Sequence, residues 1–470
     1  MNPTTMTAPV TKRGLALRLK PADWPVFALG SLLAATIATG HAMVTTPGVA
    51  LSGLGILIAV VVLAFSRRQL RADRRSDSFT RLATSLAIAI VLLGLTADAM
   101  LLAAAWIVSG RLMAGLIGHV GEWSEARDAA RRATIAFTIG DVALIGAVTL
   151  LSIAAGSSDI VAIRSVVGSS SLLTTTAAFL LVIAALARCA IPPFSNWLMR
   201  SLAAPTPVSA LMHAGFVNAG GFLLIQFAPV LEASPHARYA LFATGVVAAL
   251  VGSAIMLVRA DVKGSLAAST IAQMGFMLLT VALGAYAAAL WHMVAHGLFK
   301  AWLFLGSAGT ISTRPTRSKG LAQPWPALIA LATIVGAIFL IEARRADALL
   351  PVCLALTALL SAMAVASRSL PRGPLGAVVA LMPGALIALN AAVLVLMTAL
   401  QPDAAQPLLS PYGQLGILSL FLAGWVCQQR IVSGEQALPP SLFARLLHAG
   451  NALTTSTPRL HHRHCEGLKP

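Results

Sequence analysis

The chain has 470 residues, of which 58% are hydrophobic and 10% are charged, and its formal net charge is +17. A soluble domain usually has about 25% charged residues, so this composition excludes a water-soluble globular protein and calls for a bilayer as solvent. The basic residues lie in loops and tails between apolar spans, which excludes nucleic-acid binding as the reason for the positive charge.

Apolar spans of about 20 residues recur along the chain, which is the length that a membrane-crossing helix needs. They predict an all-α, polytopic membrane protein with about 14 transmembrane helices. The first span follows a basic segment and has no cleavage site of small residues, so we expect a retained helix and not a signal peptide. In chain order the helices are expected at 24–44, 49–66, 78–96, 97–118, 133–155, 171–191, 205–230, 239–258, 265–283, 285–310, 324–342, 346–366, 373–399 and 411–429.

The distribution of basic residues predicts the orientation. If both termini face the cytoplasm, most of the 33 lysines and arginines lie in the tails and loops of that side. The opposite side keeps Arg164, Arg238, Arg344 and Arg345. Because cytoplasmic loops carry the excess of Lys and Arg, this bias predicts an even helix count, both ends in the cytoplasm and a location in a bacterial inner membrane.

The chain divides into five regions. Two stretches, 133–258 and 265–399, each contain several helices and a buried cation, which is the arrangement of inverted repeats in many transporters. The regions are a cytoplasmic N-terminal tail at 1–23, N-terminal transmembrane helices at 24–132, a conducting core at 133–399, a last transmembrane helix at 400–429 and a polar C-terminal tail without regular structure at 430–470.

Charged residues inside a bilayer are costly, so each one is a functional hypothesis. Asp141 lies in an apolar run and is interpreted as the counter-charge of Arg188 or Lys300. Arg188 lies near the end of the span 172–190, and two interpretations fit it. It is either a fixed buried cation of an ion path or a side chain that extends to the cytoplasmic edge. Arg111 lies near the middle of its span, and the sequence names no partner for it.

A proline pair marks a second site. Pro205 and Pro207 cannot both occupy a regular helix interior. They predict a broken helix at membrane depth, in which Thr206 or Ser209 satisfies the freed backbone groups and His213 supplies an ionisable group. The alternative is an ordinary helix that begins at the prolines and carries a polar residue.

His292, His296 and Lys300 follow one another at intervals of four residues, so they lie on one face of a helix. Two imidazoles and a buried lysine can pass a proton through water, and we predict a proton path here. The alternatives are a polar stripe that packs against other helices and a metal site at the histidine pair, for which no acidic or Cys ligand lies nearby in sequence. The predicted path comprises Lys300, His292, His296, Arg188, His213 and Asp141.

Other chemistry has no signature here. The sequence has no Walker loop, no GxGxxG after a strand and no catalytic-triad pattern, so we expect no ATP hydrolysis, no catalytic residues and no cofactor. None of the four cysteines forms a CxxC pair, and no metal site is expected. The run from His461 to Cys465 is interpreted as part of a disordered end.

These motifs carry a family resemblance. The runs 192–198, 204–214, 261–263, 269–277 and 292–305 resemble, in order and spacing, the proton-translocating antiporter-like membrane subunits. That family includes the large membrane-arm subunits of respiratory complex I and the Mrp antiporter subunits. The run from His213 to Gly221 resembles the DabB family of inorganic carbon transporter subunits.

The DabB resemblance implies a function. It implies a large partner, DabA, that is similar to a zinc β-carbonic anhydrase, and a membrane subunit whose cation flow, carried by protons, drives net hydration of CO2 to bicarbonate. The membrane subunit would then be no enzyme on its own. The alternatives are a proton-translocating subunit of a NADH-quinone oxidoreductase and a Mrp-type cation/proton antiporter.

Two positions depart from the complex I pattern. Complex I relatives have a Gly-Trp-Glu motif with a buried glutamate, and Ile107 takes the place of that glutamate here. Arg188 takes the place of their buried lysine. These departures argue against a standard complex I subunit, and they also support a third hypothesis, a membrane anchor that has lost a working ion path.

Overall fold

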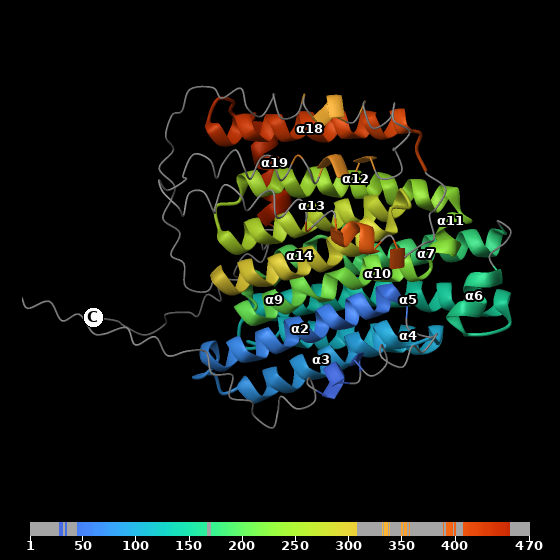
Figure 1. Ribbon diagram of the computed structural model, residues 1–470. Helices are drawn as coiled ribbons and strands as arrows, with labels where there is room; N and C mark the ends of the chain where they lie inside the picture. The colour runs from blue at the N-terminus through green and yellow to red at the C-terminus, as the bar shows by residue number, and fades with distance from the viewer. Residues whose placement is uncertain are drawn as a thin grey trace, which may run out of the picture.

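The computed structural model describes residues 28–31, 33–34, 45–166, 171–307, 331, 333–336, 338, 349–350, 352–354, 357, 389, 392–397, 399–400 and 408–451. Helices dominate this part of the chain, which contains no β-strand (Figure 1). Nine of its helices are long and apolar enough to cross a membrane, as the sequence predicts for a polytopic all-α protein. The expected spans at 24–44, 324–342, 346–366 and 373–399 fall largely outside the described residues.

The helices form in the order that the hydropathy predicts, with shifts at their ends. They are α2 (Thr46–Gln69), α3 (Ser76–Leu95), α4 (Ala99–Ile117), α5 (Ser124–Ala155), α6 (Ile160–Val166), α7 (Leu172–Arg188), α8 (Asn196–Arg200), α9 (Thr206–Ala214), α10 (Ala219–Gln226), α11 (Ala228–Glu232), α12 (Pro235–Val258), α13 (Val262–Ala282), α14 (Tyr286–Gly306), α18 (Pro411–Ser433) and α19 (Pro440–Asn451), with short 3₁₀ turns η2 (Ser201–Ala203) and η3 (Phe216–Asn218).

Local sequence signals determine where several helices begin and end. Asp98 caps α4 by accepting a hydrogen bond from the Leu101 N–H at 2.8 Å, and Asp261 caps α13 in the same way. A side-chain oxygen at this position satisfies a donor that has no partner within the helix. At the C-terminal end of α5, Gly156 adopts a left-handed conformation with φ of 63°, which glycine adopts without strain.

The long helices lie side by side as a stack (Figure 1). α2 and α3 lie toward one side of the stack and α18 lies at the other, with α12, α13 and α14 between them. α12 and α13 approach each other closely at Gly252, where an added Cβ would lie 2.5 Å from the Ala272 nitrogen. Only glycine allows this approach, which fixes the position of α13 beside its neighbours.

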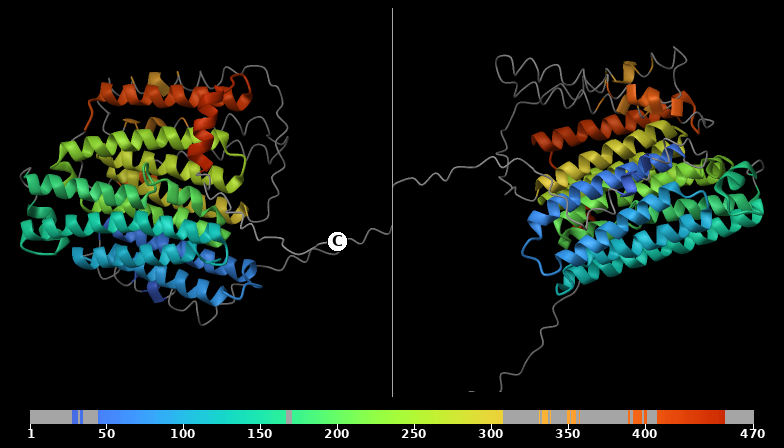
Figure 2. Two further views of the ribbon diagram at one scale, coloured as in Figure 1. Left: turned by 180° about the vertical axis from the view of Figure 1, so that it is seen from behind. Right: turned by 60° about the horizontal axis from the view of Figure 1, so that its bottom comes forward.

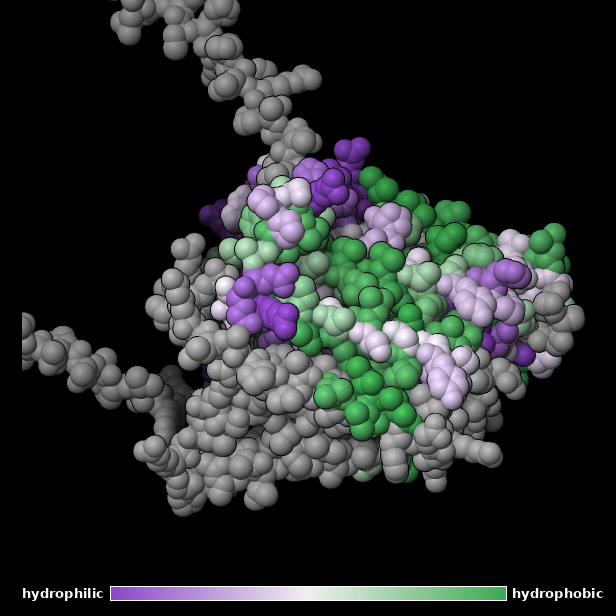
Figure 3. Space-filling model, turned by 90° about the horizontal axis from the view of Figure 1, so that it is seen from above, coloured by the Kyte–Doolittle hydropathy of each residue, from purple (hydrophilic) through white to green (hydrophobic). Residues whose placement is uncertain are grey.

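The surface is apolar along the middle of the helices. On α5, for example, Ile139 and Val142 are exposed, whereas Phe137 and Leu144 are buried in the core. On the face over α18, hydrophobic residues cover much of the middle and hydrophilic residues gather toward the ends (Figure 3). Both faces of such a helix are apolar because one contacts lipid and the other contacts protein.

The C-terminal part differs from the prediction. The sequence predicts a tail without regular structure at 430–470, but α18 continues to Ser433 and α19 follows at 440–451. α19 runs from α18 toward α12, across the direction of the long helices (Figure 2). Leu446 packs against the core, and Arg259 donates a hydrogen bond to the Gly450 carbonyl at 3.0 Å. These tertiary contacts stabilise a short amphipathic helix in a segment whose composition predicts a tail without regular structure.

Candidate functional site

The predicted row on α14 lies on a single face of the helix. Lys300 is fully buried, and His296 is 4% exposed. The rings of His292 and His296 stack with centroids 5.8 Å apart. Leu298 and Trp302 lie on the outside of the same helix. α14 therefore directs its ionisable groups into the protein and its bulky apolar groups outward, as the four-residue spacing predicts.

The partners of this row come from α13. The Lys300 Nζ donates to the Leu266 carbonyl and to the Ser269 hydroxyl, both at 3.0 Å. One turn further along α13, the Gln273 side chain lies 2.6 Å from the Nδ1 of His296 and 3.3 Å from the Ser269 Oγ. Ser269 and Gln273 thus form a continuous hydrogen-bonded line from Lys300 to His296.

His213 joins this group from α9. Its Nδ1 lies 3.0 Å from the Thr270 hydroxyl, and that hydroxyl donates to the Leu266 carbonyl at 3.0 Å. Because the hydroxyl proton is used in that bond, the Nδ1 of His213 is the donor to Thr270. The Leu266 carbonyl therefore accepts from both Thr270 and Lys300. We call Lys300, the three histidines and Ser269, Thr270 and Gln273 the Lys300 centre.

A helix break adjoins the Lys300 centre, although it lies away from the predicted position. Pro205 and Pro207 begin α9, as the alternative of a Pro-started helix describes, and Thr206 and Ser209 lie in its first turn. The helix is interrupted later, from Gly215 to the 3₁₀ turn η3. The prediction of a break at the prolines is therefore wrong, since a proline in the first helical turn has no N–H bond to lose.

Side chains satisfy the backbone at this break. The His213 carbonyl lies 3.2 Å from the Nε2 of His296, and the Ala214 carbonyl accepts from the Asn218 amide at 2.7 Å. At Gly297 an added Cβ would lie 2.6 Å from the Ala214 carbonyl oxygen, so glycine is required for α14 to approach. The close approach places His296 where it can satisfy the freed carbonyl.

A second buried cation lies among α4, α5, α7 and η3. Arg188 is 1% exposed and donates to the Ser109 hydroxyl and the Trp106 carbonyl, both at 2.8 Å. Its guanidinium carbon lies 3.8 Å from the Trp106 ring centroid, 4.3 Å from that of Phe216 and 5.7 Å from that of Phe137. Of the two interpretations of Arg188, the structure agrees with the buried cation. We call these five residues the Arg188 centre.

Asp141 forms its ion pair with Arg111, which is neither of its two predicted partners. Its carboxylate is buried and forms an ion pair with Arg111 of α4, while Arg188 and Lys300 bind other groups. The ion pair of Asp141 is therefore with Arg111 and not with Arg188 or Lys300 as the sequence suggests, and with Arg188 it keeps a longer-range attraction of opposite charges. The same contact supplies the partner of Arg111 that the sequence does not name. The Arg111 side chain is 39% exposed on an apolar helix, and this pairing stabilises its charge.

Some residues of the site have no clear signal in a single sequence. Ser269, Thr270, Gln273 and Asn218 lie in the runs that carry the family resemblance, but the sequence alone assigns them no role. The spacing of Ser269 and Gln273, four residues apart on an apolar helix, indicates only that they share one face. Their partners on α14 become visible only when the rotation of α13 is known.

Three buried polar atoms near the row have no hydrogen-bond partner within the part of the chain that the structure describes. They are the Nε2 of His213, the Oδ1 of Asn218 and the Nε2 of His292. Within the same residues, no three His, Cys, Asp or Glu side chains converge as a metal site would require. The run His461–Cys465 lies outside the described residues.

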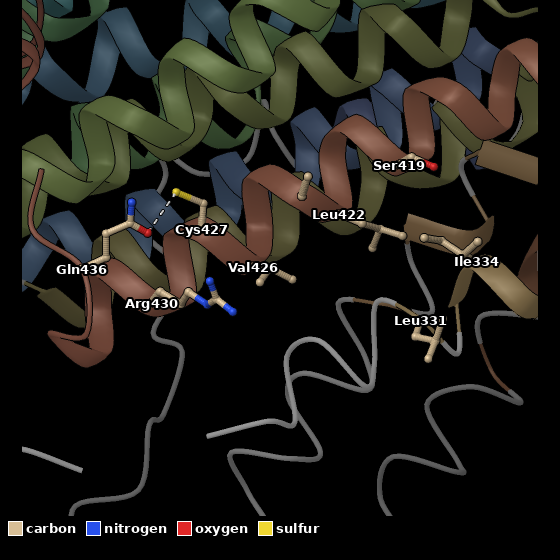
Figure 4. A pocket seen from close by; sticks show the side chains of 9 residues that line it. Leu331, Ile334, Ser419, Leu422, Val426, Cys427, Arg430 and Gln436 are labelled. Carbon is tan, nitrogen blue, oxygen red and sulfur yellow. Dashed lines mark hydrogen bonds between the residues drawn. The ribbon is translucent and has the colours of Figure 1, made fainter. Parts of the chain in front are cut away.

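A pocket of about 450 Å³ lies beside α18, away from these residues (Figure 4). The Cys427 Sγ at its edge is 4.0 Å from the Gln436 Oε1. None of the predicted site residues lines the pocket, so it is not part of the candidate ion path. Its lining is mostly apolar and includes Leu331, Ile334, Ser419, Leu422, Val426 and Arg430.

Known proteins are similar to this chain in sequence. The chain is 35% identical over 307 residues to a protein described as probable inorganic carbon transporter subunit DabB1 of Halothiobacillus neapolitanus, an alignment that covers 60% of this chain and 55% of that protein. It is 35% identical over 266 residues to NADH-quinone oxidoreductase subunit L of Mycobacterium tuberculosis, covering 56% of this chain and 41% of that protein. The chain spans about half the length of the curated relatives it matches.

The fold has a solved counterpart. A chain of the Mrp complex of Dietzia sp. DQ12-45-1b superposes with a TM-score of 0.62 over 92% of this chain and 56% of that chain, at 22% identity. The profile of the family described as NADH:quinone oxidoreductase/Mrp antiporter, TM, matches residues 96–341, which contain both buried centres and more than half of the sequence. This protein therefore belongs to the NADH:quinone oxidoreductase/Mrp antiporter transmembrane family.

Proposed function

We propose that this chain is the membrane subunit of an energy-coupled inorganic carbon pump, in which it conducts protons that drive a DabA-like, zinc-containing partner. The observation that carries the proposal is the Lys300 centre, a buried and half-buried line of hydrogen-bonded polar and ionisable groups, in a chain similar to DabB1. Lys300 and the histidines carry the proton, and Arg188 acts as a fixed charge because a guanidinium rarely releases its proton.

Hydrogen-bond continuity supports proton conduction. From Lys300 the line passes through Ser269 and Gln273 to His296, and each step is 3.3 Å or shorter. The unpartnered polar atoms of His213 and His292 border the same region. Buried polar atoms of this kind are usually satisfied by water, which would extend the line beyond the side chains.

We further propose an inner-membrane location with both termini in the cytoplasm, supported by the concentration of Lys and Arg in alternate loops. The region 133–399 is proposed as the conducting core. The orientation is tested by labelling single cysteines that are introduced in the loops near residues 74 and 157. Labelling from the outside at the second position but not at the first is expected.

The test of function is co-expression with a large DabA-like partner in a bacterium that lacks carbonic anhydrase, scored for growth in air. Growth that needs both proteins and stops with a protonophore is expected for an energy-coupled pump. Each protein expressed alone is the control. Growth that continues with the protonophore would rule out coupling to the proton gradient.

A respiratory or Mrp-type subunit is the second candidate, favoured by the 35% identity to subunit L of the quinone oxidoreductase. It predicts that the chain co-purifies with quinone-reductase subunits and that the rescue assay shows no growth. The departures at Ile107 and Arg188 favour the carbon pump over this candidate.

A further inference from the structure

The ring of His296 lies between two oxygen atoms. Its Nε2 is 3.2 Å from the His213 backbone carbonyl, and its Nδ1 is 2.6 Å from the Gln273 Oε1. A backbone carbonyl can only accept, so the Nε2 carries a proton in every state that satisfies the helix break. The proton that can come and go is therefore the one on Nδ1, which faces Gln273.

The two protonation states of His296 need different groups of the Gln273 amide as partner, either its oxygen or its NH₂ group. When Nδ1 is protonated, Gln273 must present its carbonyl oxygen. When Nδ1 is free, Gln273 must present its NH₂ group. Both arrangements use the same heavy-atom positions, since the amide oxygen and nitrogen exchange places by a half turn about the last side-chain bond.

Ser269 connects the orientation of the Gln273 amide to the protonation state of Lys300. With the amide nitrogen toward Ser269, the hydroxyl accepts from Gln273 and can donate to a neutral Lys300 amine. With the amide oxygen toward Ser269, the hydroxyl donates to Gln273 and accepts from the Lys300 ammonium. The positions fit both patterns, because the Ser269 Oγ lies 3.3 Å from the Gln273 Nε2 and 3.0 Å from the Lys300 Nζ.

We propose that Gln273 is a positioning residue of the proton path, whose amide turns over each time His296 exchanges its Nδ1 proton with Lys300. The inference rests on the proposed proton conduction and names the group that couples its two carriers. The Lys300 Nζ loses one proton and the His296 Nδ1 gains one by way of water beside the amide, so charge is conserved, and the amide turns but takes up no proton and breaks no covalent bond.

The surroundings of His296 are consistent with one excess proton at a time. His292 and Lys300 face it from its own helix, and His213 faces it from α9. From α13, the side chains at this level are the uncharged Ser269, Thr270 and Gln273. A second positive charge would face a cation without a described carboxylate between them, and that repulsion favours sharing a single proton.

The first experiment compares matched variants in the growth and uptake assay of the proposed pump. Gln273→Met keeps the side-chain volume but can neither donate nor accept, and it is expected to lower uptake about 10-fold or more. Gln226→Met is the control, because Gln226 is a buried glutamine on α10 that accepts a hydrogen bond from Thr45 and lies outside the Lys300 centre. It is expected to change uptake less than about 2-fold.

The second experiment observes the coupling directly, by solid-state NMR of the full chain in lipid with ¹⁵N-labelled histidine and glutamine. The His296 and Gln273 signals are identified by their loss in His296→Gln and Gln273→Met. As pH varies between about 5 and 9, the Gln273 amide signal is expected to shift together with the His296 Nδ1 signal. In Gln273→Glu, an ionised carboxylate can only accept, so Nδ1 is expected to stay protonated.

These readouts separate the inference from the proposed function. If Lys300→Ala abolishes uptake while Gln273→Met supports uptake like the wild type, the coupling is wrong and the pump stands. If Lys300→Ala has no effect, the conducting path is wrong, and the NMR shifts still decide the amide coupling. A Gln273 signal that stays constant while His296 changes its Nδ1 proton would overturn the inference in either case.

Discussion

The Arg188 centre and the Lys300 centre each bury a cation, but they surround it with different chemistry. Arg188 lies against three aromatic rings and donates to a hydroxyl and a backbone carbonyl. Among the described residues, no carboxylate forms an ion pair with it; Asp141 pairs with Arg111 instead. A guanidinium keeps its proton, and aromatic faces attract its charge, so this centre holds a charge in one place.

The partners of Lys300 can change roles. A hydroxyl, an amide and an imidazole can each donate in one arrangement and accept in another. Under the proposed function, this difference gives the two centres separate tasks, a fixed charge at Arg188 and a movable proton at Lys300. The turn η3 lies between them, since Phe216 contacts Arg188 and Asn218 contacts the break beside His296.

Removing the movable proton carrier is expected to have the largest effect. Lys300→Ala should abolish uptake in the growth assay while the protein remains in the membrane at normal abundance, because the proposed path loses a group that gives up and regains the proton and the Leu266 carbonyl keeps Thr270 as a donor. Lys263→Ala is the control, since Lys263 lies in the first turn of α13 and donates to the Ala204 carbonyl, which is outside the Lys300 centre. Normal uptake by Lys300→Ala would favour a membrane anchor without a working ion path.

Replacing the fixed charge is expected to lower both stability and uptake. Arg188→Met leaves the Trp106 carbonyl and the Ser109 hydroxyl without their donor, at a cost of about 1–3 kcal/mol. Arg188→Lys keeps the charge but cannot bind both groups and stack flat, so an intermediate loss is expected. Thermal unfolding in detergent measures the effect, with the exposed Arg131→Met as control. If Arg188→Lys matches the wild type, the planar stacking has no part in stability.

The link between the centres is expected to be the next most sensitive position. Asn218→Leu removes the donor to the Ala214 carbonyl and is expected to cost about 1–3 kcal/mol of stability. Asn218→Asp should cost more, because it places an acceptor against a carbonyl oxygen. Thermal unfolding and uptake are measured together, and the exposed Asn196→Leu is the control. Equal stability of Asn218→Leu and Asn218→Asp would contradict a role as donor.

Sequence reasoning reached the features that depend on local spacing. The row of His292, His296 and Lys300 follows from helical periodicity alone, and most of the spans follow from the length of the apolar runs. It missed what depends on how helices meet, such as the pairing of Asp141 with Arg111. The break involves a contact that the local sequence does not signal, because Gly297 allows α14 to approach the Ala214 carbonyl from more than 80 residues away. A proline pair restricts only the backbone next to it, so it indicates where α9 begins and not where the helix breaks.

The smallest effect on stability is expected at the Asp73 carboxylate, which lies outside the membrane-crossing helices. Asp73 accepts from the Arg75 backbone N–H at 2.8 Å and lies 2.8 Å from the His119 Nε2. These hydrogen bonds, the backbone bond foremost, lower the pKa of Asp73. A lowered pKa in the fold means that the stabilisation is present above the unfolded pKa of about 3.9 and is lost as pH falls through the folded value.

Asp73→Asn is therefore expected to lower stability at pH 7 by less than about 1 kcal/mol, since the Asp73 side chain is 28% exposed and water and salt screen the pair. The difference from the wild type should shrink at acidic pH, where the wild-type carboxylate becomes protonated too. Thermal unfolding at pH 7 and at low pH measures this, with the exposed Asp77→Asn as control. The Asp73 carboxylate faces water, whereas the membrane part encloses the Arg188 guanidinium. Solvent can therefore replace lost hydrogen bonds at Asp73 but not at Arg188. A loss of stability as large as that of Arg188→Met would contradict this distinction.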